Sequence, residues 1–146
     1  MRTLLILSLV LMAYDDFKTR SVSLVELCFF GICILFYSIR ASGWTHMLNN
    51  AMCNIVAGVL MLVGAHIYYI IRKGCYTSLL NTKIGVGDLI YLAISSMLFP
   101  LSVYCWFIII SCLSGIGYSI MCRNHSIPFI GVSSPVLITI LLIEWI

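Results

Sequence analysis

An uncharged run of 34 residues, from Leu89 to Cys122, constrains this chain more than any other feature. As one helix it would extend about 50 Å at 1.5 Å per residue, whereas the hydrocarbon core of a bilayer is about 30 Å thick. The run therefore predicts two short membrane-spanning helices joined by a tight turn. Pro100 is the expected break. A break there leaves the first of the two helices very short, so the turn could also lie a few residues later.

The composition is typical of a membrane protein. Hydrophobic residues make up 62% of the 146 residues and charged residues 9%, and the net charge is +3. Soluble domains are about half apolar and about a quarter charged. These values argue against a soluble domain, a disordered tail and a nucleic-acid-binding protein, which needs dense basic patches. The seven cysteines have no CxxC spacing, so we expect no disulfide framework, no metal site and no cofactor.

Six membrane-spanning segments are expected in a single domain that covers residues 1–146. Besides the two in the uncharged run, they are Thr3 to about Asp16, Val22–Ile39, Ala51–Ile71 and Pro128–Ile146. The first segment lacks an AxA-like cleavage site, so we expect it to be retained. The fold class that follows is all-α: a polytopic membrane helix bundle with about six transmembrane helices.

The basic residues predict how these segments are oriented. Six of the eight fall in loops on one side of the bundle, and only Arg2 and Arg40 fall on the other side. The six are Lys18, Arg20, Arg72, Lys73, Lys83 and Arg123. The positive-inside rule places the Lys- and Arg-rich loops in the cytoplasm. We therefore expect a multi-pass protein of the inner (cytoplasmic) membrane, with the lipid bilayer as a partner and both termini outside.

Carboxylates at the ends of these segments are the candidates for chemistry, because ionisable residues within membrane segments are costly and usually functional. Asp16, or its neighbour Asp15, closes the first segment, and Asp88 opens the fourth, so both belong to the same membrane face. Two carboxylates brought close together share one proton, and such a pair can activate a water molecule and protonate a leaving amine. This is the chemistry of aspartic peptide hydrolysis, which needs neither a metal nor a covalent nucleophile.

Four further residues are candidates for binding a substrate: Gly85, Gly87, Lys18 and Arg20. The two glycines allow an extended substrate strand to approach the chain closely just before Asp88. The alternative is structural, because an Asp after a glycine-rich turn is a common N-cap of a helix. Lys18 and Arg20 could also hold the aspartate pair electrostatically or contact lipid phosphates.

Three segments resemble the motifs of the type IV prepilin peptidases. Asp16-Phe17-Lys18-Thr19-Arg20-Ser21-Val22 is similar to the family's Asp-x-x-x-Arg-x-Ile pattern, Gly85-Val86-Gly87-Asp88 to its second motif, and Ile127-Pro128-Phe129 to its C-terminal Ile-Pro-Phe signature. The resemblance implies a membrane aspartic protease of the GxGD type whose catalytic pair is Asp16 and Asp88. Such enzymes remove the leader peptide from type IV prepilins, secretion pseudopilins or archaeal preflagellins at the cytoplasmic membrane face.

The chain also departs from that family. Ser23 and Ile90 stand where members often have Pro and Lys, and the N-terminal insertion with CxxC motifs that accompanies N-methylation is missing. We therefore predict protease activity without methyltransferase activity. Tyr14-Asp15 is similar to the Tyr-Asp motif of presenilin-like GxGD proteases, but the spacing to Arg20 and Val22 selects Asp16.

A second class of function stays open at the level of sequence. A non-enzymatic membrane transporter or complex subunit could use Asp16 and Asp88 as a proton or cation site. The sequence does not identify the substrate, the oligomeric state, or which aspartate is the base and which the acid.

Overall fold

The computed structural model describes residues 2–73, 85–122 and 127–143. Within these ranges the chain forms six helices and no strand, which confirms the all-α bundle. The helices are α1 (Arg2–Thr19), α2 (Leu24–Ser42), α3 (Trp44–Lys73), α5 (Val86–Ser95), α6 (Leu101–Cys122) and α7 (Phe129–Ile143). Among the described residues, three stretches are long and apolar enough to cross a membrane: α2, residues 44–68 of α3, and α6. Helices α5 and α7 are apolar but shorter, so six full crossings stay a prediction.

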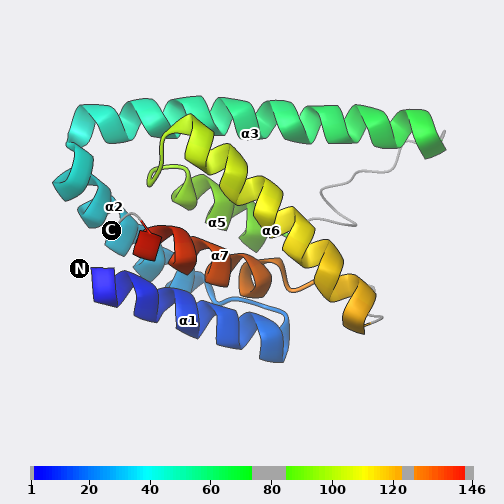
Figure 1. Ribbon diagram of the computed structural model, residues 1–146, viewed down its shortest axis with the longest axis horizontal. Coiled ribbons are helices and arrows are strands. Elements are labelled where there is room, and N and C mark those ends of the chain that lie inside the picture. The colour runs from blue at the N-terminus through cyan, green and yellow to red at the C-terminus, as the bar shows by residue number, and fades with distance from the viewer. Residues whose placement is uncertain (1, 74–84, 123–126, 144–146) are drawn as a thin grey trace.

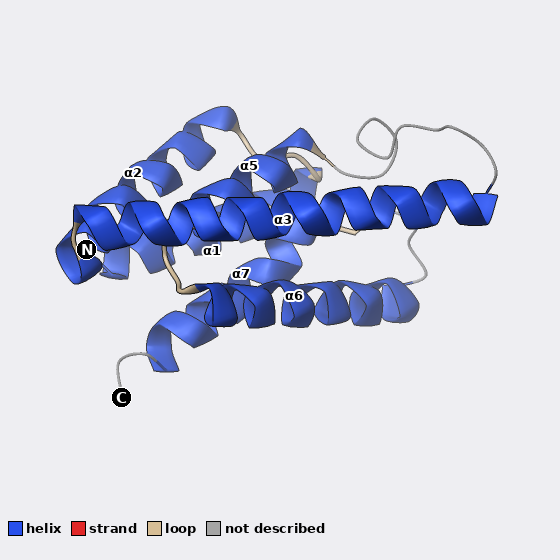
Figure 2. Ribbon diagram, turned by 90° about the horizontal axis from the view of Figure 1, so that it is seen from above, coloured by secondary structure: helices blue, strands red, loops and turns tan. Residues whose placement is uncertain are grey.

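Successive helices run back and forth between two ends of the molecule. The N-terminal end of α1, the α2–α3 junction and the α5–α6 turn lie toward one end (Figures 1 and 2). The C-terminal end of α1 and the first turns of α5 and α7 lie toward the other end. Helix α3 extends past the rest of the bundle in both views. This alternation places the end of α1 and the start of α5 at the same end of the bundle, as expected from the sequence.

Pro100 marks the break in the uncharged run. Helix α5 ends at Ser95, and α6 begins at Leu101, directly after the proline. The carbonyl of Pro100 accepts the N–H of Tyr104 at 3.0 Å, so the proline occupies the N-terminal boundary of α6, where its missing N–H costs nothing. The turn therefore lies before Pro100, and the alternative of a later turn is wrong. As a result α5 has only 10 residues.

The connections around α2 differ from the expected span limits. Ser23 is the N-cap of α2 and forms a capping box with Glu26, so the helix begins after Val22. Gly43 alone separates α2 from α3, and its φ of 80° is a conformation that glycine adopts easily. The third span, expected from Ala51, instead continues a helix that begins at Trp44.

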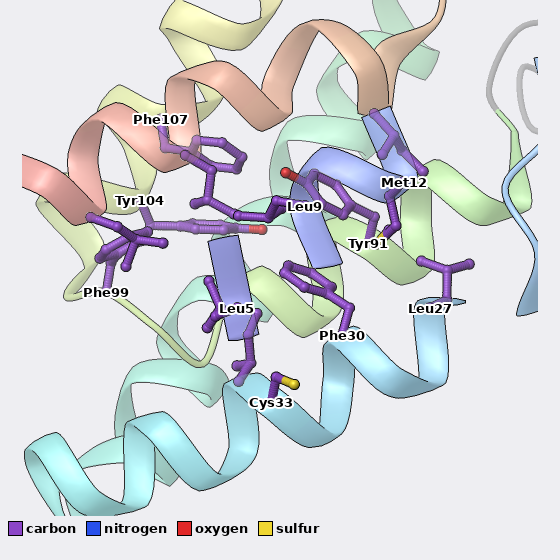
Figure 3. Close-up of a cluster of buried hydrophobic side chains, with 14 residues drawn as sticks. Leu5, Leu9, Met12, Leu27, Phe30, Cys33, Tyr91, Phe99, Tyr104 and Phe107 are labelled. Atoms are coloured by element: carbon purple, nitrogen blue, oxygen red, sulfur yellow. The ribbon is translucent and has the colours of Figure 1, made fainter. Parts of the chain in front are cut away.

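The core lies between α1, α2, α5, α6 and α7 (Figure 3). Its labelled members are Leu5, Leu9 and Met12 of α1, Leu27, Phe30 and Cys33 of α2, Tyr91 of α5, Phe99 of the turn, and Tyr104 and Phe107 of α6. The rings of Phe30 and Tyr91 stack with centroids 5.4 Å apart. Met12 and Tyr91 lie about one helical turn from Asp16 and Asp88, so core packing fixes the two helices that carry the aspartates.

The outer surface is apolar. Large hydrophobic side chains are exposed along α2, α3 and α6, among them Val25, Leu60 and Met121. Soluble proteins rarely expose apolar surface on this scale, whereas lipid tails cover it without a penalty. Together with the three long apolar helices, this surface identifies the chain as a membrane protein.

Candidate active site

Asp16 lies in the last turn of α1 and is almost fully buried, with 6% of its surface exposed. Its Oδ2 accepts a hydrogen bond of 2.7 Å from the backbone N–H of Gly131, in the first turn of α7. The backbone N–H of Ile130 also donates to the carboxylate. The two partners in the first bond are 115 residues apart in the sequence, so this contact joins the two ends of the chain.

Pro128 explains why α7 offers these donors. Its carbonyl accepts the N–H of Val132 at 3.0 Å, which makes Pro128 the N-cap residue of α7. The first backbone N–H groups of a helix lack partners within the helix, and an N-cap side chain usually supplies an acceptor. Proline has no such acceptor. The carboxylate of Asp16 takes its place and lies at the positive end of the helix dipole.

Asp88 occupies the first turn of α5, where Gly85 is the N-cap residue. The expectation that Asp88 itself is the N-cap is therefore wrong by three residues. Its carboxylate accepts the backbone N–H of Gly85, which is the returning half of a capping box. A Cβ placed on Gly85 would lie 3.1 Å from Asp88 Oδ2, so the glycine leaves room for this carboxylate.

The two aspartates are close enough to influence each other's ionisation, and neither lies in the three stretches that could cross a membrane. Burial and the negative charge of Asp16 raise the pKa of Asp88 from 3.8 to about 6. Burial also raises the pKa of Asp16, against the lowering effect of the Gly131 and Ile130 N–H groups and the Arg20 charge. Asp16 therefore has three partners that stabilise its ionised form, whereas Asp88 has one.

A cavity of about 310 Å³ opens where the ends of α1, α5 and α7 meet. The residues that line it are Asp16, Arg20, Ser21, Val22, Gly85, Gly87, Asp88, Ile127, Pro128, Phe129 and Ile130. All but Ile130 belong to the three segments that the sequence singles out. The cavity combines two carboxylates with one guanidinium and the glycine backbone before Asp88.

The structure separates the candidate residues into two groups. Gly85, Gly87 and Arg20 line the cavity with the aspartates. Lys18 is exposed, with its Nζ 5.5 Å from the centroid of the Tyr14 ring, and it does not line the cavity.

Asp15 also lies away from the cavity lining. Its carboxyl group lies near that of Glu26 on α2. The geometry thus favours Asp16 over Asp15 as the partner of Asp88. Lys83 and Arg123, and the side chains of Arg72 and Lys73, lie outside the described residues.

Sequence reasoning missed the contribution of Ile130 and Gly131. Their backbone N–H groups bind Asp16, and a backbone donor leaves no trace in residue identity. The nearest indication was Pro128, an N-cap that has no side-chain acceptor of its own.

No family model matches this chain, and no curated protein or solved structure matches it either. In the part of the chain that the structure describes, no three His, Cys, Asp or Glu side chains group as ligands of a metal ion would.

Proposed function

We propose that this protein is a membrane aspartic endopeptidase that removes the leader peptide from type IV prepilin-like substrates, including pseudopilins and preflagellins. The observation that carries the proposal is the meeting of Asp16 and Asp88 in one cavity, where the charge of Asp16 raises the pKa of Asp88. The resemblance of three segments to prepilin peptidase motifs supports it, because all three border this cavity. The proposed site faces the cytoplasm at the inner membrane, in keeping with the basic residues of that side.

The environments of the two carboxylates support different roles. Asp16, which accepts two backbone N–H groups and lies near Arg20, is the ionised base that takes a proton from a water molecule. In the complex with substrate, Asp88, whose pKa is already raised to about 6 in the free protein, is the group that holds the shared proton and gives it to the leaving amine. A bound peptide excludes water from the cavity and raises the pKa of Asp88 further, which favours this division.

The substrate strand is expected to contact the first turn of α5, where the backbone N–H groups of Val86 and Gly87 lack acceptors within the helix. Gly87 has no heavy atom closer than 4.0 Å to the position of an added Cβ, so its surface is open to a neighbouring chain. The membrane helix of the substrate would lie in the bilayer against the apolar outer surface. In this arrangement the scissile bond enters the cavity beside Asp16 and Asp88.

The transporter alternative has weaker support. Asp16 is in the last turn of α1 and Asp88 in the first turn of α5, so both lie at one end of their helices. Transport sites for protons or cations usually lie near the bilayer midplane, often at interrupted helices.

The test is leader removal from co-expressed candidate substrates: a type IV prepilin, a pseudopilin and a preflagellin. Cleavage is followed by gel shift and N-terminal sequencing, with the wild type compared with Asp15→Asn, Asp16→Asn and Asp88→Asn at equal membrane expression. We expect both Asp16→Asn and Asp88→Asn to abolish cleavage and Asp15→Asn to retain it. Cleavage that survives Asp88→Asn would overturn the aspartic mechanism. Loss with Asp15→Asn alone would move the pair by one residue.

A further inference from the structure

We propose that Gly131 is a positioning residue, whose lack of a side chain lets the first turn of α7 approach α1 closely enough to hold Asp16. It has no side chain to touch a substrate, and it acts through the carboxylate that its N–H binds. The effect on cleavage rests on the proposed function. The effect on Asp16 itself does not.

The contact between Gly131 and Phe17 carries this inference. A Cβ on Gly131 would lie 2.9 Å from Phe17 Cε2, 3.0 Å from Cδ2 and 3.2 Å from Cζ. Side-chain carbons are not found so close together, so an alanine here must displace either the ring or the helix. No other glycine in the described part of the chain would place a Cβ closer than 3.1 Å to a neighbour.

Phe17 is 47% exposed, but a shift of its ring would disturb a second contact. Its ring also packs on the ring of Tyr118 in α6, with centroids 5.8 Å apart and planes tilted by 53°. The ring therefore lies between α6 and α7. Phe17 directly follows Asp16 in the last turn of α1, so a force on the ring acts on the helical turn that carries the carboxylate.

The hydrogen bond from Gly131 to Asp16 is sensitive to such a shift. It measures 2.7 Å, and a donor–acceptor distance of about 3.6 Å is no longer a hydrogen bond. A displacement of about one ångström would therefore remove a donor that favours ionised Asp16. The pKa of Asp16 would then rise, because burial would act with less opposition.

Few other charges act on this carboxylate among the described residues. Arg20 follows α1 and favours the ionised form of Asp16. Asp88 on α5 is the acidic neighbour that interacts with Asp16. The first turn of α7 carries no charged side chain, and Glu26 of α2 lies near Asp15. Loss of the backbone N–H donors of α7 would thus raise the pKa of Asp16 directly.

The experiment compares the wild type with Gly131→Ala, the double variant Gly131→Ala/Phe17→Ala, and the control Gly117→Ala, all as full chains in membranes. Gly117 is a helical glycine with no atom within 4 Å of an added Cβ, so its substitution should change cleavage less than twofold. We expect Gly131→Ala to move the acidic limb of the pH profile up by about one unit, which lowers cleavage about tenfold at pH values on that limb. Removal of the Phe17 ring should restore much of the lost rate, because it removes the clash.

A second readout needs no substrate. Carbodiimide labels protonated carboxyl groups, so the fraction of Asp16 labelled falls as the pH rises through its pKa. An Asp15→Asn background, with peptide mass spectrometry, assigns the label to Asp16. We expect the labelling midpoint to rise by about one unit in Gly131→Ala and to return in the double variant.

The two readouts separate the two hypotheses. A midpoint shift that is reversed in the double variant, in a protein that cleaves none of the candidate substrates, would support the positioning role and reject the proposed function. An unchanged midpoint in Gly131→Ala would overturn the positioning role even if cleavage occurs. A shift that persists without the Phe17 ring would also overturn it, because the clash would not be its cause.

Discussion

Two buried polar clusters in this molecule are built on different principles. At the α5–α6 turn, Asn54 of α3 is completely buried, and its Nδ2 donates to the carbonyls of Ser96 and Phe99, both at 2.8 Å. At the opposite end, Asp16 and Asp88 bring two carboxylates together in partly desolvated positions. The first cluster is neutral and satisfies backbone carbonyls. The second concentrates like charge.

The difference separates a structural cluster from the proposed functional one. A buried amide that satisfies two carbonyls stabilises the fold, because these carbonyls would otherwise be buried without partners. Two adjacent carboxylates destabilise it at neutral pH, because burial and mutual repulsion both oppose ionisation. Ionisable groups held at such a cost are typical of active sites. The comparison predicts that substitutions in the first cluster lower the free energy of unfolding and that substitutions in the second raise it.

Asn54→Ala is expected to have the largest effect on stability. It removes two hydrogen bonds and leaves the carbonyls of Ser96 and Phe99 unsatisfied, which should lower the free energy of unfolding by about 2–4 kcal/mol. Chemical unfolding in detergent micelles measures this loss. Asn49→Ala, at an exposed position of the same helix, is the control and should change stability by less than about 0.5 kcal/mol. An Asn54→Ala protein as stable as the control would remove the structural half of the comparison.

Much of the framework of both clusters could be predicted from the sequence. The break at Pro100 follows from the length of the uncharged run, and the placement of Asp16 and Asp88 at the same end of the bundle follows from alternating spans. These features depend on short-range rules: hydrophobic length, proline chemistry and the reversal of direction at each loop. That the two aspartates share one cavity does not follow from the spans.

The remaining features depend on contacts that no local pattern encodes. Asn54 meets its partners 42 and 45 residues away, and Asp16 meets Gly131 115 residues away. Helix α3 begins at Trp44 and not near Ala51, because polar residues such as Asn49 are compatible with a helix even where they interrupt the apolar pattern. Hydropathy marks which residues suit the bilayer and does not mark where a helix begins.

Asp88→Asn is expected to have the next largest effect on stability, and it should raise the free energy of unfolding where Asn54→Ala lowers it. The pKa of Asp88 in the fold is about 6, above its ordinary 3.8, so the folded state binds the proton more tightly than the unfolded state. The stabilisation from protonated Asp88 is therefore complete below about pH 4 and is lost as the pH rises through 6. For a group partly open to solvent, this corresponds to about 1–2 kcal/mol.

Asn keeps the shape of Asp88 and cannot ionise. We expect Asp88→Asn to be about 1–2 kcal/mol more stable than the wild type at pH 7 and to have a smaller dependence of stability on pH between 4 and 7. Unfolding at a series of pH values measures both. Asn49→Ala should retain the wild-type pH dependence. If Asp88→Asn is less stable than the wild type at pH 7, Asp88 belongs with Asn54 as a structural residue.

The smallest expected change in stability distinguishes the two glycines before Asp88. An added Cβ on Gly87 meets nothing closer than Leu27 Cδ1 at 4.0 Å, so Gly87→Ala should stabilise the helix start by about 0.5 kcal/mol. Gly85→Ala should show no such gain, because its Cβ would lie 3.1 Å from Asp88 Oδ2. If Gly87→Ala is more stable yet cleaves several-fold more slowly, the glycine is retained for the approach of a substrate strand, at the expense of stability. A Gly87→Ala protein that gains stability and cleaves at the wild-type rate would exclude Gly87 from the substrate-binding surface and confine the functional cluster to the carboxylates, Gly85 and the first turn of α7.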